Sequence, residues 1–261
     1  MTLRHLALAV LVGLYLACFA GSPGGSLATL PAGAALQPPS LAHPFGTDDL
    51  GRDLLAAALQ GGRTSLEVAG LATLFATLLG LSFGLVAGLG APWLDEAAMR
   101  VTEVVASLPA LLLAVLAGAL FGGSTMNLAL ILGLTRWPSL ARIIRMEVRA
   151  LLGREFLRAA VALGAGPLHM ARRHLLPNLL GPVGAAAAII FGGAVVAEAS
   201  LAFVGLGDPA ATSWGQMAAG GFALVGRAWW PWAVPTLAIV LVSGLVALLV
   251  EHAAIGREAQ A

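Results

Sequence analysis

The sequence predicts an all-α polytopic membrane protein with six transmembrane helices, and three observations lead to this fold class. Of the 261 residues, 59% are hydrophobic and only 10% are charged, whereas soluble globular domains carry about 25% charged residues. The apolar residues gather in segments long enough to cross a bilayer, which takes about 20 residues of helix. A polar stretch, residues 155–178, lies between these segments, and residues 136–173 hold 8 of the 14 basic residues.

The composition excludes several functions. The net charge of +1 leaves no broad basic surface for nucleic acid, so we expect no nucleic-acid partner. All 14 basic residues are arginines, and a phosphate-binding loop of the Gly-x-x-x-x-Gly-Lys type needs a lysine, so the chain cannot be its own ATPase of that type. The single cysteine, Cys18, excludes an internal disulfide and a cysteine-cluster metal site, and it is expected to be an apolar residue of the first span.

The chain begins with a short apolar segment, residues 6–20. The segment is shorter than a usual span, and Tyr15-Leu16-Ala17-Cys18 hints at a lipoprotein cleavage site, so a cleaved signal peptide is the alternative to an anchor. Tyr15 does not suit such a site, and we therefore interpret residues 1–21 as the first transmembrane helix. Residues 22–63 are predicted to form an extracytoplasmic loop with a short helix.

Within this loop, residues 43–53 combine one imidazole with three carboxylates. His43, Asp48, Asp49 and Asp53 are suitable ligands for a divalent metal ion, which makes a metal site one interpretation. The favoured interpretation is structural and includes no metal. Asp48 or Asp49 can cap a helix that starts near Leu50, the glycines suit turns, and Arg52 can pair with an acid nearby.

Five further spans are predicted from the remaining apolar segments: residues 68–94, 101–121, 128–144, 179–204 and 230–250. The first of these five carries no charge between residues 68 and 94 and has a small residue at every fourth position, which favours close packing against another helix. These small residues are Gly80, Gly84 and Gly88. Pro109 is expected to kink the span that covers residues 101–121.

The arginines determine the predicted orientation. By the positive-inside rule, the loop that contains most of residues 136–173 lies in the cytoplasm. Counting back through four spans places Arg4 in the cytoplasm, and six spans return the C-terminus to the same side. The outer loops are then residues 21–63, 122–127 and 205–229. Three tryptophans stand where an interfacial aromatic belt is expected: Trp229, Trp230 and Trp232.

The polar stretch itself is predicted to form two short helices with a sharp bend. Helix formers fill residues 155–163, the sequence Gly-Ala-Gly-Pro at residues 164–167 breaks the chain, and Pro177 closes the unit. Small side chains keep one surface low enough for another protein's backbone to approach. We therefore interpret the stretch as a docking site, with an amphipathic loop that lies on the bilayer as the alternative.

These residues resemble the signature of bacterial ABC importer permeases. The signature positions in this sequence are Glu155, Ala159, Ala160, Gly164, Leu176 and Pro177. The resemblance implies a type-I ABC importer permease fold in which this hairpin is the coupling helix and inserts into a cleft of a separate ATPase subunit. It also implies that ATP and Mg²⁺ are bound by that partner, and that this chain carries no cofactor and no metal.

Further motifs are similar to the dipeptide, oligopeptide and nickel branch of this family, specifically to its second permease subunit. The first is the extracytoplasmic motif in residues 43–53, which includes His43, Asp48, Gly51, Arg52 and Asp53, followed by Gly-x-Arg-Thr-Ser-Leu at residues 61–66. The other covers residues 197–207 and continues to Ser-Trp-Gly at residues 213–215. The resemblance implies import of peptides, with nickel or another small solute as the alternative.

The same resemblance implies an assembly in the bacterial cytoplasmic membrane. Its members are a homologous second permease, two ATPase subunits and an extracytoplasmic binding protein, all around a multi-pass chain with both termini in the cytoplasm. Residues 64–251 correspond to the permease domain, with the coupling loop at residues 147–178, and residues 252–261 form a short cytoplasmic tail.

Two charged residues fall within predicted spans, where ionisable groups are costly and often functional. Glu198 is interpreted as a bundle-facing residue near the outer gate, with a purely structural pairing role as the alternative. Arg136 precedes Trp137 and Pro138, where family members usually carry a small or uncharged residue. Either Arg136 faces a water-filled translocation path, or the fourth span begins earlier than residue 128.

A different class of function remains as a remote alternative. A membrane enzyme or a proton-coupled transporter could use His169, His174, Glu155 or Glu198. A hydrolase needs a nucleophile, a histidine and an acid in one pocket, yet both histidines lie among arginines in the polar stretch and Ser200 has no histidine near it in the sequence. We therefore expect a transport subunit and not an enzyme.

Overall fold

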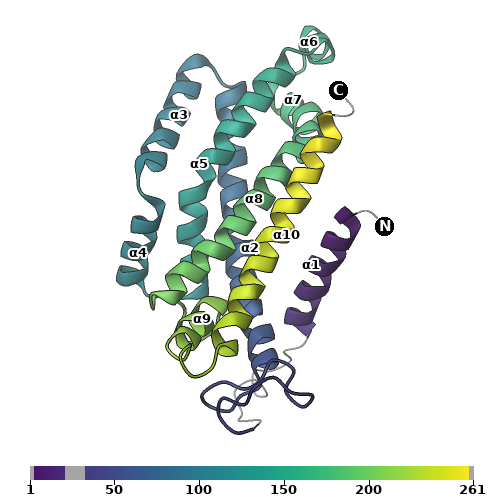
Figure 1. Cartoon of the computed structure of the whole chain (residues 1–261). Coiled ribbons are helices and arrows are strands. Elements are labelled where there is room, and N and C mark those ends of the chain that lie inside the picture. The colour runs from purple at the N-terminus through teal and green to yellow at the C-terminus, as the bar shows by residue number, and fades with distance from the viewer. Residues whose placement is uncertain (1–2, 21–32, 259–261) are drawn as a thin grey trace.

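The computed structural model describes residues 3–20 and 33–258, which form a bundle of long helices (Figure 1). The described part of the chain contains no strand, and only an isolated bridge joins Thr47 to Asp53. The elements in chain order are α1 (Leu3–Ala20), α2 (Leu54–Leu89), α3 (Pro92–Ser107), α4 (Ala110–Phe121), α5 (Thr125–Leu152), α6 (Glu155–Ala162), α7 (Pro167–Met170), the π-helical turn η1 (Ala171–Leu175), α8 (Leu176–Phe203), α9 (Trp214–Phe222) and α10 (Trp230–Glu258).

Helices α2 and α5 pack closely along a stripe of glycines. A Cβ atom added to Gly80 would lie 2.8 Å from the Cβ of Leu140, one added to Gly84 would lie 2.6 Å from that of Ile144, and one added to Gly88 would lie 2.6 Å from a methyl of Val148. Only glycine allows these backbones to approach so closely. The predicted close packing of this stripe against another helix is confirmed.

Within the described residues, three helices are long and apolar enough to cross a membrane: Leu54–Leu89, Leu168–Phe203 and Trp230–His252. A fourth span results if Pro92–Ser107 and Leu112–Phe121 are taken together, although they are bent by 82°. The apolar segment of α1 is shorter. Length and composition therefore identify three or four of the six predicted spans. The predicted kink at Pro109 is a full break, because this residue stands between α3 and α4.

The boundaries of the second predicted span differ from residues 68–94. Helix α2 begins at Leu54, so residues 54–63 form its first turns and not a separate short helix of the loop. It ends at Leu89, because Gly90 leaves the helical conformation and Pro92 starts α3. The charged connector that follows is therefore part of a new helix.

The core consists of two large clusters of buried side chains. One surrounds Trp214 and includes Cys18, which is fully buried, as predicted for an apolar residue of the first span. The other includes Ile144 and Val148 of α5 together with Leu157 and Leu175 of the predicted docking stretch. In Figure 1, α6 and α7 lie at one end of the bundle, and α9 lies at the other with the loop that precedes α2.

Candidate functional site

The stretch that contains residues 155–177 is a helical hairpin held firmly by the core. Helix α6 ends before Gly164, whose φ of +86° suits glycine and reverses the chain. Helix α7 and η1 then lead directly into α8. Three side chains of the hairpin are buried in the core cluster of α5 and α8: Leu157, Met170 and Leu175. The predicted short helix before the bend and the bend itself at residues 164–167 are present. The second short helix is not separate, because the chain stays helical from residue 168 into α8 and Pro177 lies in the first turn of α8 instead of closing the unit.

The exposed side of the hairpin carries large apolar side chains among arginines. Leu163 is 89% exposed, Leu168 is 64% exposed and Phe156 is 48% exposed. No heavy atom lies within 4 Å of a Cβ placed on Gly164, so the bend is open to an approaching surface. Because large apolar groups rarely stay in water without a partner, this surface can dock another protein. Sequence reasoning overlooked Leu163, although it stands next to the glycine that was singled out.

The signature positions lie together on this hairpin with different exposures. Glu155 and Ala159 are exposed on α6, and Ala160 is half-buried. At the start of α8, Leu176 is half-buried and Pro177 is exposed. The structure thus gathers the predicted coupling residues at one end of the bundle.

The residues of the enzyme alternative do not all meet, because Glu198 is separated from the others. The rings of His169 and His174 lie 5.7 Å apart on the hairpin. Glu198 lies 24 residues beyond His174, near the other end of α8, which corresponds to about 36 Å along a helix. No common pocket therefore unites these histidines with that carboxylate.

At the opposite end of the bundle, the motif in residues 43–53 is a network of paired groups. The Asp53 carboxylate lies 2.8 Å from Nδ1 of His43 and accepts a hydrogen bond of 3.1 Å from the backbone N–H of Ala56. The Arg52 Nε donates to Asp48 at 2.6 Å, as predicted for local pairing. The prediction that Asp48 or Asp49 caps the helix is wrong, because the helix starts at Leu54 and Asp53 caps it.

Hydrogen bonds within this network favour the charged form of the Asp53 carboxyl. Burial raises the pKa of Asp53, but the hydrogen bonds from His43 and from the first turn of α2 outweigh this effect and hold the pKa below its usual value. Gly46 and Gly51 have φ values of +78° and +73°, which glycine adopts without strain. Within residues 3–20 and 33–258, no group of three or more His, Cys, Asp and Glu side chains is arranged to hold a metal ion.

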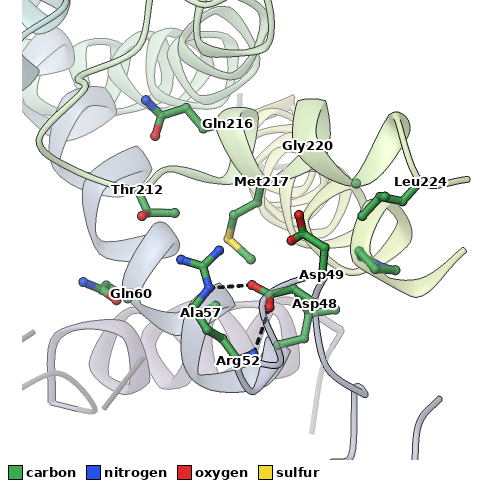
Figure 2. A pocket seen from close by; sticks show the side chains of 13 residues that line it. Asp48, Asp49, Arg52, Ala57, Gln60, Thr212, Gln216, Met217, Gly220 and Leu224 are labelled. Carbon is green, nitrogen blue, oxygen red and sulfur yellow. Dashed lines mark hydrogen bonds and ion pairs between the residues drawn. The ribbon is translucent and has the colours of Figure 1, made fainter. Parts of the chain in front are cut away.

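A polar pocket lies between this motif, the first turns of α2, helix α9 and the start of α10 (Figure 2). Its volume is about 210 Å³, less than the 300 Å³ or more that is typical of small-molecule sites. Its charged lining residues are Asp48, Asp49 and Arg52, and uncharged polar residues and apolar residues such as Met217 and Leu224 complete it. The pocket suits a single polar side chain better than a whole peptide.

Glu198 is buried where three helices meet. The Ser65 hydroxyl of α2 donates to its carboxylate at 2.8 Å, and the hydroxyl of Ser213 bonds to it as well. The same Ser65 oxygen accepts a hydrogen bond of 3.1 Å from the backbone N–H of Trp214. Glu198 therefore faces the bundle and helps to join α2, α8 and α9.

Trp214 reinforces this junction and was overlooked as a functional candidate. Its indole Nε1 donates to the carbonyl oxygen of Ala58 at 2.7 Å, and its ring contacts Gly62 so closely that a Cβ there would lie 2.6 Å from the ring. A Cβ on Gly215 would lie 2.5 Å from the carbonyl oxygen of Ala199. The Ser-Trp-Gly sequence thus packs α9 against both α2 and α8.

Arg136 lies near the middle of α5, whose first residue, Thr125, comes only slightly before residue 128, where the span was expected to begin. Its Nη2 donates to the carbonyl oxygen of Gly193 on α8 at 3.0 Å, and its side chain is half-buried. An earlier start of the span therefore does not move Arg136 to a helix end.

Comparisons with known proteins agree with this architecture. Residues 80–254 match the family described as "Binding-protein-dependent transport system inner membrane component", and the chain belongs to this family. The fold is that of ABC importer permeases. One solved structure, an inward-facing MetNI methionine ABC transporter, matches with a TM-score of 0.63 at 20% identity, over 76% of this chain and 95% of that one. An amino acid ABC transporter matches with a TM-score of 0.57 at 18% identity, over 76% and 92%.

The particular relatives in sequence are permeases of bacterial transport systems. A protein of Brucella suis biovar 1, named as a peptide permease, is 37% identical over 206 residues, which cover 78% of this chain and 68% of that protein. The dipeptide transport system permease protein of Alkalihalophilus pseudofirmus is 35% identical over 208 residues, which cover 79% of this chain and 68% of that protein. This chain is thus an ABC importer permease.

Proposed function

We propose that the chain forms half of the translocation path of an ATP-driven peptide importer. The observation that carries the peptide assignment is the identity of 35–37% to proteins named as peptide or dipeptide permeases, over more than three quarters of this chain. A homologous second permease completes the path, and an extracytoplasmic binding protein delivers the peptide. The chain lies in the bacterial cytoplasmic membrane with both termini in the cytoplasm.

In this proposal, the hairpin of residues 155–177 docks on a separate ATPase subunit. Two such subunits bind ATP and Mg²⁺, while this chain carries no cofactor. The exposed apolar side chains of Phe156, Leu163 and Leu168 support the docking role, because they provide a contact surface on an otherwise anchored element. Gly164 permits close approach at the bend.

The structure also suggests how movement of the hairpin reaches the membrane. Leu175 is fully buried and leads directly into α8, so a displacement of the hairpin moves α8 as a unit. Near its far end, α8 carries Glu198, which bonds to Ser65 of α2 and lies against α9. ATP-driven closure would therefore tilt α8 and change its contact with α2 and α9 around Glu198. We assign Glu198 to the outer gate for this reason.

The other end of the bundle faces the binding protein in this orientation. The motif with His43, Asp48, Gly51, Arg52 and Asp53 forms a rigid extracytoplasmic platform beside the polar pocket. A pocket of about 210 Å³ can receive one polar side chain of a docked partner.

The test is peptide uptake into proteoliposomes that contain this chain with the second permease and the ATPase subunits of its native host. Labelled dialanine is added outside with the binding protein, and ATP is enclosed. We expect uptake that requires ATP, the ATPase and the binding protein. Uptake driven by a proton gradient in liposomes that contain this chain alone would contradict the proposal.

A further inference from the structure

Arg136 carries a charge that the described part of this chain does not neutralise. It lies within α5, which packs along the apolar helix α2, and the ion pairs of the described residues do not include it. Its partner is the carbonyl oxygen of Gly193, 3.0 Å from Nη2, which bears only a partial negative charge. A guanidinium group has five N–H donors. Most of its capacity to bind an anion is therefore unused.

The nearest acidic candidate on the facing helix is already engaged. Glu198 lies on α8, as Gly193 does, but its carboxylate is buried beside the hydroxyls of Ser65 and Ser213. A counter-charge for Arg136 must therefore come from outside the described part of the chain.

Arg136 is half-buried and lies next to a strip of polar residues on α5. On the side of α5 that does not contact α2, polar residues recur at helical spacing, with Thr135 half-buried and Ser139 and Arg142 exposed. Such a face is costly against lipid tails, so it faces water or another protein. Arg136 lies at the edge of this face, beside α8.

Glycine at position 193 shapes the site. A Cβ there would lie 2.6 Å from Nη1 of Arg136, so only glycine lets the guanidinium rest on the backbone of α8 in this position. Because a carbonyl oxygen is a weaker partner than a carboxylate, an incoming carboxylate can displace it and later be released. The planar guanidinium can bind a carboxylate through two parallel hydrogen bonds.

We propose that Arg136 binds the C-terminal carboxylate of a peptide that passes along the polar face of α5. The inference rests on the peptide importer function proposed above, and it assigns to this residue a part in substrate selectivity. An acidic side chain of the second permease is the rival source of the counter-charge, and the experiment distinguishes the two.

The experiment compares two probes in proteoliposomes that contain the complete importer: dialanine and dialanine amide, which lacks the carboxylate. Each is supplied at a concentration that saturates the binding protein, so that differences between variants arise in the permease. We expect Arg136→Gln to lower the ratio of dialanine uptake to amide uptake by about tenfold, as for loss of a charged hydrogen bond. Arg136→Lys should lower this ratio less than Arg136→Gln does. Arg142→Gln, which removes a charge from the exposed face, should leave the ratio unchanged.

The outcomes separate the inference from the proposed function. An equal loss of uptake for both probes in Arg136→Gln, or an unchanged ratio, overturns the carboxylate role while peptide import stands. Loss of the second permease from the purified Arg136→Gln complex also overturns it, in favour of an acidic residue of that subunit. If the wild-type importer moves neither probe with ATP, the proposed function fails and this inference fails with it.

Discussion

The Ser65 hydroxyl donates a hydrogen bond of 2.8 Å to the carboxylate of Glu198, although 133 residues separate the two in sequence. Both side chains are buried, and the same hydroxyl oxygen accepts from the backbone N–H of Trp214. Ser65 thus satisfies one group on α8 and one on α9 from its place on α2. Removing it would leave the buried backbone N–H of Trp214 without this acceptor and Glu198 with Ser213 alone, and an unsatisfied buried group is more costly than the loss of an ordinary hydrogen bond.

Ser65→Ala should therefore destabilise the protein by about 1–3 kcal/mol. Thermal unfolding in detergent measures the effect as a lower Tm. Glu198→Gln keeps the shape and still accepts a hydrogen bond from Ser65, so its effect on Tm should be smaller. Co-purification of the ATPase should be unaffected by Glu198→Gln, because the residue lies far from the hairpin. An uncoupled ATPase in this variant would show that Glu198 is wrongly placed.

Two glycine-to-alanine substitutions in α2, one inside the glycine stripe and one outside it, should differ in their effect on the free energy of unfolding. Gly84→Ala places a Cβ 2.6 Å from that of Ile144 and 2.8 Å from the backbone oxygen of Ala141. We therefore expect this variant to lower the free energy of unfolding by about 1–3 kcal/mol. Gly70→Ala, on the same helix, meets nothing within 4 Å and should be neutral or gain about 0.5–1 kcal/mol. Equal Tm values for the two variants would contradict the close packing of α2 on α5.

Asp208 gives a prediction that depends on pH. Burial raises the pKa of its carboxyl, but hydrogen bonds from the backbone and hydroxyl of Thr125 and from the backbone of Ala210 outweigh burial and lower it. A lowered pKa stabilises the fold above the unfolded-state pKa of about 3.9, and this contribution is lost as the pH falls through the lower folded-state value.

Asp208→Asn should thus reduce stability at pH 7 by about 0.5–1 kcal/mol, as for a carboxylate at a helix N-terminus. Its Tm should approach that of the wild type below about pH 4. Asp49→Asn is the control, since Asp49 is an exposed carboxylate and should not alter Tm. A Tm difference for Asp208→Asn that stays constant down to low pH would argue against the charge as its cause.

The large features of the fold could be predicted because they depend on composition and short-range pattern. The break at residues 164–167 follows from Gly-Ala-Gly-Pro, and the packing of α2 follows from its glycine spacing. Each of the six predicted spans overlaps a helix or, for residues 101–121, the broken pair α3 and α4, since long apolar segments in a membrane protein form helices. The boundaries shifted where a glycine or proline near a helix end outweighed hydropathy, as at Gly90 and Pro92.

The contacts between distant residues could not be predicted in the same way. Nothing local in the sequence pairs Ser65 with Glu198, or Trp214 with the carbonyl oxygen of Ala58. The cap of α2 was assigned to Asp48 or Asp49 because three aspartates stand close together and each can cap a helix. Pairing of Asp48 with Arg52 leaves Asp53 for the helix, and this depends on the path of the loop in space.

Docking of the hairpin on a separate ATPase is tested most directly by co-purification of the tagged full chain from membranes of its native host. Leu163→Asp adds a charge to a side chain that is 89% exposed, and Gly164→Val adds bulk at the bend and strain at a φ of +86°. Gly166→Ala is the matched control, because nothing lies within 4 Å of its added Cβ.

Wild type and Gly166→Ala should recover the ATPase and the second permease, whereas Leu163→Asp and Gly164→Val should recover the second permease alone. Retention of the second permease shows that the variants still fold and assemble in the membrane. If both hairpin variants recover the ATPase at the wild-type level, or if the wild type recovers none, residues 155–177 are not the docking site.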